Sequence, residues 1–170
     1  MLTTLLTEPI RAEHQALLPH IEELGAAATW IPTAPALVVH EKLIHALAFL
    51  QNELVPHAKA EEETLYPAVE GCMQAPGATD TMSRDHVEVL RLVDELATLR
   101  DNLGDPPSEA DRDRIAAILH GLHAIVALHF AKEEEIYLPI LDRCLTAESA
   151  AELFERMHHV AHLHKEAAVV

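Results

Sequence analysis

The sequence predicts an all-α protein: an up-down-up-down four-helix bundle built from two repeated helical hairpins, plus a C-terminal fifth helix. Apolar residues recur with a period near 3.6 and never alternate with a period of 2, so no strands are expected. Turn signals rich in proline and glycine separate long helical segments. The second half of the chain repeats the first half after a shift of 72 residues. Four long helices joined by short connections pack as a bundle of this kind.

The positions of the turn signals define the expected helices. The signals lie at residues 30–33, 75–77, 104–107 and 145–146. They leave helices at residues 4–28, 35–70, 79–103, 108–143 and about 147–168. Ser108 is expected to cap the fourth helix. We expect residues 1–170 to form a single domain, with the bundle in residues 4–143 and the last helix covering it.

The composition narrows the possible partners. Lys and Arg total 12 against 28 Asp and Glu, which gives a formal net charge of −16. A surface this acidic repels phosphate, so we expect neither nucleic-acid binding nor binding to anionic membranes. The N-terminus does not have the basic and apolar segments of a leader peptide, and no run of apolar residues approaches the length of about 20 that a membrane span needs. Two cysteines are too few for a disulfide framework. These features predict a cytoplasmic location, and the thirteen histidines raise the question of a metal.

The internal repeat carries a set of potential metal ligands. In the first half His14 is followed by His57 and Glu61, and 72 residues further on His86 is followed by His129 and Glu133. The repeat also aligns other residues: Glu13 with Asp85, Pro67 with Pro139, and Cys72 with Cys144.

These six side chains occupy positions that face the core. The apolar seam of the second helix reaches Leu54, and His57 and Glu61 occupy the next positions of the same seam. His129 and Glu133 continue the corresponding seam of the fourth helix. His14 and His86 begin the apolar stripes of the first and third helices. Each helix of the bundle therefore contributes one core histidine.

A buried group of this composition predicts a metal centre. Burying two carboxylates without partners costs several kcal/mol each. Two cations would compensate them, with two histidines on each cation and both glutamates bridging. Each metal would keep a position open to a small ligand. Iron suits this nitrogen and oxygen set best, and manganese or zinc are possible substitutes.

Here the chain resembles the hemerythrin-like (HHE cation-binding) domains. The resemblance covers about residues 8–143, through Glu13-His14, Asp85-His86 and the segments 57–67 and 129–139. It implies a four-helix bundle around a non-haem di-iron centre. His14 and His57 would bind one iron, His86 and His129 the other, and Glu61 and Glu133 would bridge them. Members bind oxygen, and some sense iron, oxygen or nitric oxide or act on peroxide.

One position departs from the oxygen-carrying hemerythrins, which have a second histidine one turn along the third helix. Leu90 stands there in this chain, with Met82 one turn before His86. The resemblance therefore favours binding of O2 or a related small ligand with redox activity toward peroxide or nitric oxide. Two alternatives stay open: an iron- or oxygen-responsive sensor without turnover, and a di-iron oxygenase or oxidase acting on a small metabolite. Whether the protein is an enzyme is left open.

Further residues allow more than one interpretation. Tyr137, one turn beyond Glu133, is either an additional ligand or a packed tyrosine, and Glu53, one turn before His57, is either a ligand, a support for one or a solvated residue. His158 and His162 have a spacing that can hold a metal or simply forms a helix face. We expect the following residues to line the site: Leu18, Leu54, Leu90 and Val126. A solvated face is expected for Glu62, Glu63, Glu134 and Glu135, a kink for Pro56, and free thiols for Cys72 and Cys144.

Overall fold

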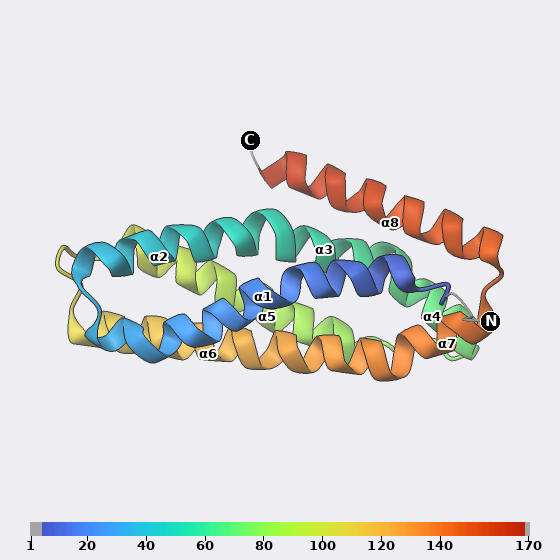
Figure 1. Cartoon of the computed structure of the whole chain (residues 1–170), viewed down its shortest axis with the longest axis horizontal. Helices are drawn as coiled ribbons and strands as arrows, with labels where there is room; N and C mark the ends of the chain where they lie inside the picture. Colours follow the sequence, from blue (N-terminus) through green and yellow to red (C-terminus); the bar gives the residue numbers. More distant parts are fainter. Residues whose placement is uncertain (1–4, 169–170) are drawn as a thin grey trace.

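The computed structural model describes residues 5–168 and confirms the predicted all-α bundle with an additional C-terminal helix (Figure 1). Within these residues there is no strand. The first long helix is α1 (Glu8–Trp30), followed by the 3₁₀ turn η1 (Ile31–Thr33). The third is α5 (Asp80–Asp101), and the last helix is α8 (Ala147–Ala168). The predicted start at residue 4 lies outside the described residues.

The second and fourth long helices are each composed of several segments. The second consists of α2 (Ala36–Phe49), η2 (Leu50–Leu54), α3 (Val55–Ala60), η3 (Glu61–Leu65) and α4 (Tyr66–Met73). The fourth consists of α6 (Glu109–Lys132), η4 (Glu133–Tyr137) and α7 (Leu138–Cys144). As predicted, Ser108 caps α6, because its side chain accepts a hydrogen bond from the Asp111 N–H in a reciprocal capping box.

The segments η2, η3 and η4 are π-helical turns, each followed by a proline two residues after its end. The prolines are Pro56, Pro67 and Pro139. Proline lacks the N–H that an α-helix needs, and its ring crowds the carbonyl four residues earlier. A wider turn relieves this conflict and shifts the following side chains around the helix by one position.

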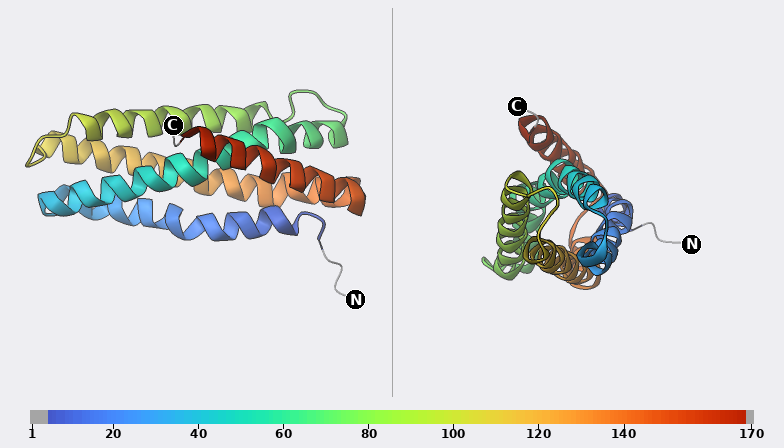
Figure 2. Two further views of the ribbon diagram at one scale, coloured as in Figure 1. Left: turned by 90° about the horizontal axis from the view of Figure 1, so that it is seen from above. Right: turned by 90° about the vertical axis from the view of Figure 1, so that its left-hand side faces the viewer.

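The four long helices surround a common axis, and α8 lies outside them (Figure 2). It packs along α3 and the two π turns that flank α3, η2 and η3. The apolar core consists of two clusters. The first cluster extends from the end of the bundle that contains η1 as far as Phe130. The second cluster fills the opposite end of the bundle, which α4, α7 and α8 form. The six predicted ligands form a polar layer between them.

The helix Glu109–Cys144 has the length and composition of a membrane span, with a window of mean hydropathy 1.5. In this fold it packs against α1 and α5, and 44 % of that window is buried. A core helix of a bundle meets the same criteria, so this feature is weak evidence for a membrane.

The prediction of two free thiols is wrong, because Cys72 and Cys144 form a disulfide with their Cα atoms 5.8 Å apart. The prediction assumed that the second and fourth helices stay diagonal along their whole length. Instead α4 and α7 lie against each other at the end of the bundle. The π turns before both segments redirect the helices, so two residues related by the repeat meet there.

Candidate metal centre

All six predicted ligands lie in one buried layer, and none is more than 6 % exposed. They come from all four long helices: His14 from α1, His57 and Glu61 from the second, His86 from α5, and His129 and Glu133 from the fourth. The four imidazoles direct their Nε2 atoms toward the two carboxylates. The structure therefore brings together every residue of this predicted set.

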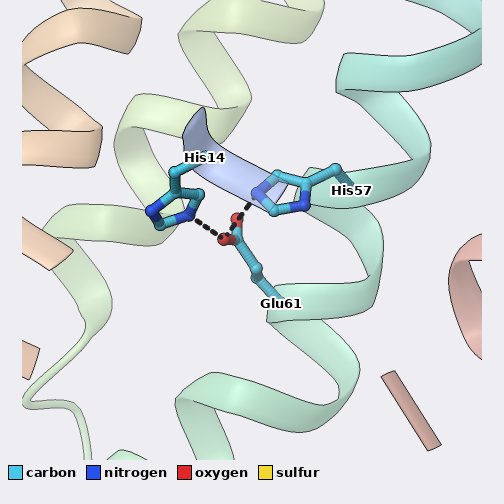
Figure 3. Close-up of side chains that lie close together, drawn as sticks. All are labelled: His14, His57 and Glu61. Atoms are coloured by element: carbon cyan, nitrogen blue, oxygen red, sulfur yellow. Dashed lines mark ion pairs between the residues drawn. The ribbon is translucent and has the colours of Figure 1, made fainter. Parts of the chain in front are cut away.

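Glu61 lies between the two histidine pairs. Its Oε1 is 2.9 Å from His57 Nε2 and 3.6 Å from His14 Nε2 (Figure 3). Its Oε2 is 3.3 Å from His86 Nε2 and 3.9 Å from His129 Nε2. One carboxylate oxygen thus faces each pair, as a bridging ligand requires.

Glu133 has a similar position on the other side of the layer. Its Oε2 lies 3.3 Å from His14 Nε2, and its Oε1 lies 3.6 Å from His129 Nε2. The ligand atoms form two groups that can hold a metal, with Glu61 common to both. These groups are His14, His57 and Glu61, and Glu61, His86 and His129.

Each ligand histidine donates its Nδ1–H to a carboxylate on the preceding helix of the bundle. The four contacts are His57 to Glu13 (3.2 Å), His86 to Glu62 (2.7 Å), His129 to Asp85 (3.1 Å) and His14 to Glu134 (2.8 Å). Because the fourth helix supports the first, the contacts form a closed ring. A carboxylate at Nδ1 fixes the imidazole orientation and leaves Nε2 as the donor for a metal.

This ring corrects the prediction of a solvated face for the two Glu triplets. Glu62 and Glu134 support ligand histidines, whereas Glu63 and Glu135 are exposed. Two supporting carboxylates are themselves paired with a cation. Arg11 forms an ion pair with Glu134, and Lys132 forms one with Asp85.

The layer contains buried ligand atoms that have no hydrogen-bond partner. They are Nε2 of His14 and His57, both carboxylate oxygens of Glu61, and Oε2 of Glu133. Unpaired buried polar atoms are costly, and a cation bound to them would remove that cost. The donor set is imidazole nitrogen and carboxylate oxygen, which suits divalent first-row metals. The residues present therefore fit a metal centre.

The six side chains also perturb one another's pKa values. Burial opposes the charged form of each imidazole, but the close carboxylates of Glu133 and Glu61 outweigh it and raise the pKa of His14 and of His129 to about 10. For His57, burial is outweighed by the charge of the adjacent Glu61 carboxylate and by the hydrogen bond with Glu13, which raise its pKa to about 9. Burial acts to raise the pKa of Glu61, but the neighbouring histidines hold it well below its usual range.

Neither predicted additional residue reaches the layer. The Tyr137 hydroxyl donates to the Ala78 carbonyl oxygen at 3.2 Å, and Glu53 is exposed and pairs with Lys165 of α8. The sequence reasoning missed Tyr66, whose hydroxyl lies 3.0 Å from His129 Nε2 and donates to Glu133 Oε1 at 3.1 Å. The π turn explains the difference, because it brings the fifth residue after Glu61 onto the site in place of the fourth.

A small cavity borders the layer on the side opposite Tyr66. Its accessible volume is about 10 Å³, which suffices for one water molecule. Its apolar walls are Leu54, Ala58, Val89, Val126 and Phe130. The sequence predicted that Leu54 and Val126 line the site, and both are part of the cavity wall. The same prediction is wrong for Leu18, which is 41 % exposed, and for Leu90, which lies next to the cavity-lining Val89 but not in the wall.

A family model described as hemerythrin HHE cation binding domain matches residues 5–141 and 77–169. The chain belongs to this family. The second match of the HHE model covers the second hairpin and α8, as an internal repeat would produce. No curated protein and no solved structure gives a match. Family membership and the buried His and Glu clusters together assign metal binding to this HHE domain.

Proposed function

We propose that this HHE domain holds a non-haem di-iron centre that binds O2 or a related small ligand and reacts with peroxide or nitric oxide. The observation that carries the proposal is the two pairs of buried histidines on either side of Glu61. The ligand atoms of His14, His57 and Glu61 have no hydrogen-bond partner. His14 and His57 would hold one ion, His86 and His129 would hold the other, and the carboxylates of Glu61 and Glu133 would serve both. This donor set leaves room on both for a small ligand.

When bound, two iron ions supply electrons to a small oxygen- or nitrogen-containing ligand. The protein's own residues prepare the site for that chemistry. The Nδ1 contacts fix all four imidazoles before a metal arrives. The Tyr66 hydroxyl closes the layer beside His86 and His129 and offers a further oxygen donor. On the opposite side, the apolar walls of the cavity limit the access of bulk water.

The cavity also supports a small ligand rather than an organic substrate. An accessible volume of about 10 Å³ admits about one water-sized molecule. Sites for organic ligands typically have about 300–1,000 Å³. We therefore do not extend the proposal to an oxygenase acting on a metabolite.

The test measures peroxide consumption by iron-loaded full-length protein. We expect consumption by the wild type and a loss of at least about a hundredfold in His57→Ala/His129→Ala, which removes one ligand from each metal. The control is His45→Ala/His120→Ala, because both residues are exposed. The redox proposal fails if loaded wild type and the ligand variant are equally inert.

One observation favours a sensor as a second candidate. The helix α8 packs directly on the segments that carry His57 and Glu61, and His164 of α8 pairs with Glu63 in the π turn η3. A change in metal occupancy that moves η3 would reach α8 through these contacts. In a sensor, hydrogen exchange of α8 slows on metal loading while peroxide is not consumed. Equal exchange with and without metal would contradict this candidate.

A further inference from the structure

A second cavity, of about 230 Å³, lies between α1, the η2–α3 segment and α8. Figure 1 shows α8 running over α3 at this place. The cavity borders on Glu13, His57, His158, His162 and Lys165, together with Glu53 and three apolar residues. His57 also borders the small inner cavity. One ligand histidine therefore separates the outer cavity from the metal centre.

The outer cavity presents donors for a divalent metal. His158 and His162 are one turn apart on α8, a spacing that places two imidazoles on one helix face. Both are exposed, and His162 pairs with Glu166 of α8 at 3.4 Å, so binding a cation requires His162 to leave that partner and both imidazoles to turn toward Glu13, without repacking the core. Glu13 uses Oε2 to accept from His57, which leaves Oε1 as a third donor. The positive charge of Lys165 is compensated by Glu53.

The charges behind the ligand histidines distinguish this side of the bundle from the sides of His14 and His129. A cation that approaches His14 from outside meets Arg11, and one that approaches His129 meets Lys132. Among the described residues, Glu13 forms no ion pair with a lysine or arginine.

We propose that Glu13, His158 and His162 form a transient site for a divalent first-row metal ion, from which the ion passes His57 into the centre. This inference rests on the proposed di-metal function and adds the route by which the centre is filled. Imidazole and carboxylate donors suit ferrous iron and manganese alike. Three donors, two of them on exposed side chains, bind more weakly than the buried set and so release the ion inward.

The first test measures the rate of filling. Metal-free full-length protein is mixed anaerobically with two equivalents of ferrous iron, and aliquots are quenched with a chelator and analysed for bound iron. We expect His158→Ala/His162→Ala to fill at least about tenfold more slowly than the wild type and to reach the same final content. The matched control, His159→Ala, lies on the same helix outside the cavity and is expected to fill at the wild-type rate.

The second test measures the site directly. Iron-loaded protein is titrated with manganese(II), and bound manganese is followed by electron paramagnetic resonance. We expect one additional weak site in the wild type and in His159→Ala, and none in the double variant. Filling of the double variant at the wild-type rate, or the absence of the weak site, overturns the proposal. If the wild type takes up no iron in its centre, the proposed function fails, while the titration of that protein still shows whether the outer site exists.

Discussion

At the scale of residues, the clearest feature is the ring of carboxylates that supports the four histidines. Glu62 accepts from His86 Nδ1 at 2.7 Å. We predict that Glu62→Ala weakens metal binding by about 10–100-fold, because the imidazole loses the group that orients it. Competition with a chelator of known affinity measures this. Glu135→Ala removes an exposed carboxylate from the equivalent triplet, and an equal effect of both variants would contradict the assignment.

Two tyrosines provide a second comparison. Tyr66 Oη lies beside the Nε2 atoms of His86 and His129, whereas Tyr137 is bonded to a backbone carbonyl. We predict that Tyr66→Phe weakens binding of the metal held by these two histidines about tenfold and alters the visible spectrum of the iron-loaded protein. Tyr137→Phe is expected to leave both unchanged. A Tyr66→Phe spectrum identical to that of the wild type would exclude the phenol from the site.

The sequence predicted the six ligands because a repeat places them on apolar seams, where polar residues need an explanation. It did not predict Tyr66, because counting by four residues along an ideal α-helix selects Tyr137. The supporting role of Glu62 and Glu134 was missed for a related reason, since adjacent charged residues read as a solvated face. The alignment of Glu13 with Asp85 in the repeat was the available signal for half of the ring.

At the scale of elements, the helix positions agree with the prediction to within a few residues at each end. The internal π turns were not predicted, although Pro56, Pro67 and Pro139 mark each of them. A proline inside an apolar helical pattern was interpreted as a kink, but a kink alone does not change which residues face the core. A π turn does, because it adds one residue to the turn.

The disulfide between α4 and α7 leads to a prediction about stability. It joins positions 72 residues apart in sequence, and closing a loop of that length lowers the entropy of the unfolded chain by an amount worth about 4 kcal/mol. We predict that Cys72→Ser/Cys144→Ser lowers the free energy of unfolding by about 2–4 kcal/mol, as measured by denaturant titration. Under reducing conditions the two proteins should become equal. A difference that persists with reductant would point to a packing effect instead.

The disulfide also bears on the expected location. The scarcity of cysteine was one reason to expect a reducing cytoplasm, and a formed Cys72–Cys144 bond removes that reason. The bond ties the two hairpins together beyond the metal layer, at the end opposite η1.

At the scale of the whole molecule, the centre links stability to pH. The pKa values of His14 and His129 are raised from 6.5 to about 10, and that of His57 to about 9. A raised pKa means that the charged histidines stabilise the metal-free fold most below pH 6.5, and that this stabilisation is lost as the pH rises through about 9 to 10. We therefore predict that the Tm of metal-free protein falls between pH 7 and pH 10.

The iron-loaded protein provides the comparison for this prediction. Its Nε2 atoms hold metal in place of protons, so its Tm should lack this fall, and loading at pH 7 should release protons into an unbuffered solution. Thermal unfolding followed by circular dichroism across this pH range measures the effect. The same pH dependence in both forms would contradict the linkage.

The overall architecture was predictable because the duplication, the helical period and the turn signals agree with one another. The position of α8 on the bundle was not predictable, because its amphipathic pattern shows that one face is buried but not which helix covers that face. The structure places it over α3, next to the metal layer and the outer cavity.

The central claim is that the buried layer holds two metal ions. The most direct measurement is the metal content per chain of freshly purified full-length protein by elemental mass spectrometry. We expect two ions per chain, with iron predominant, and fewer than one in His57→Ala/His129→Ala. A chain that holds no metal, even after anaerobic loading with ferrous iron, would contradict it.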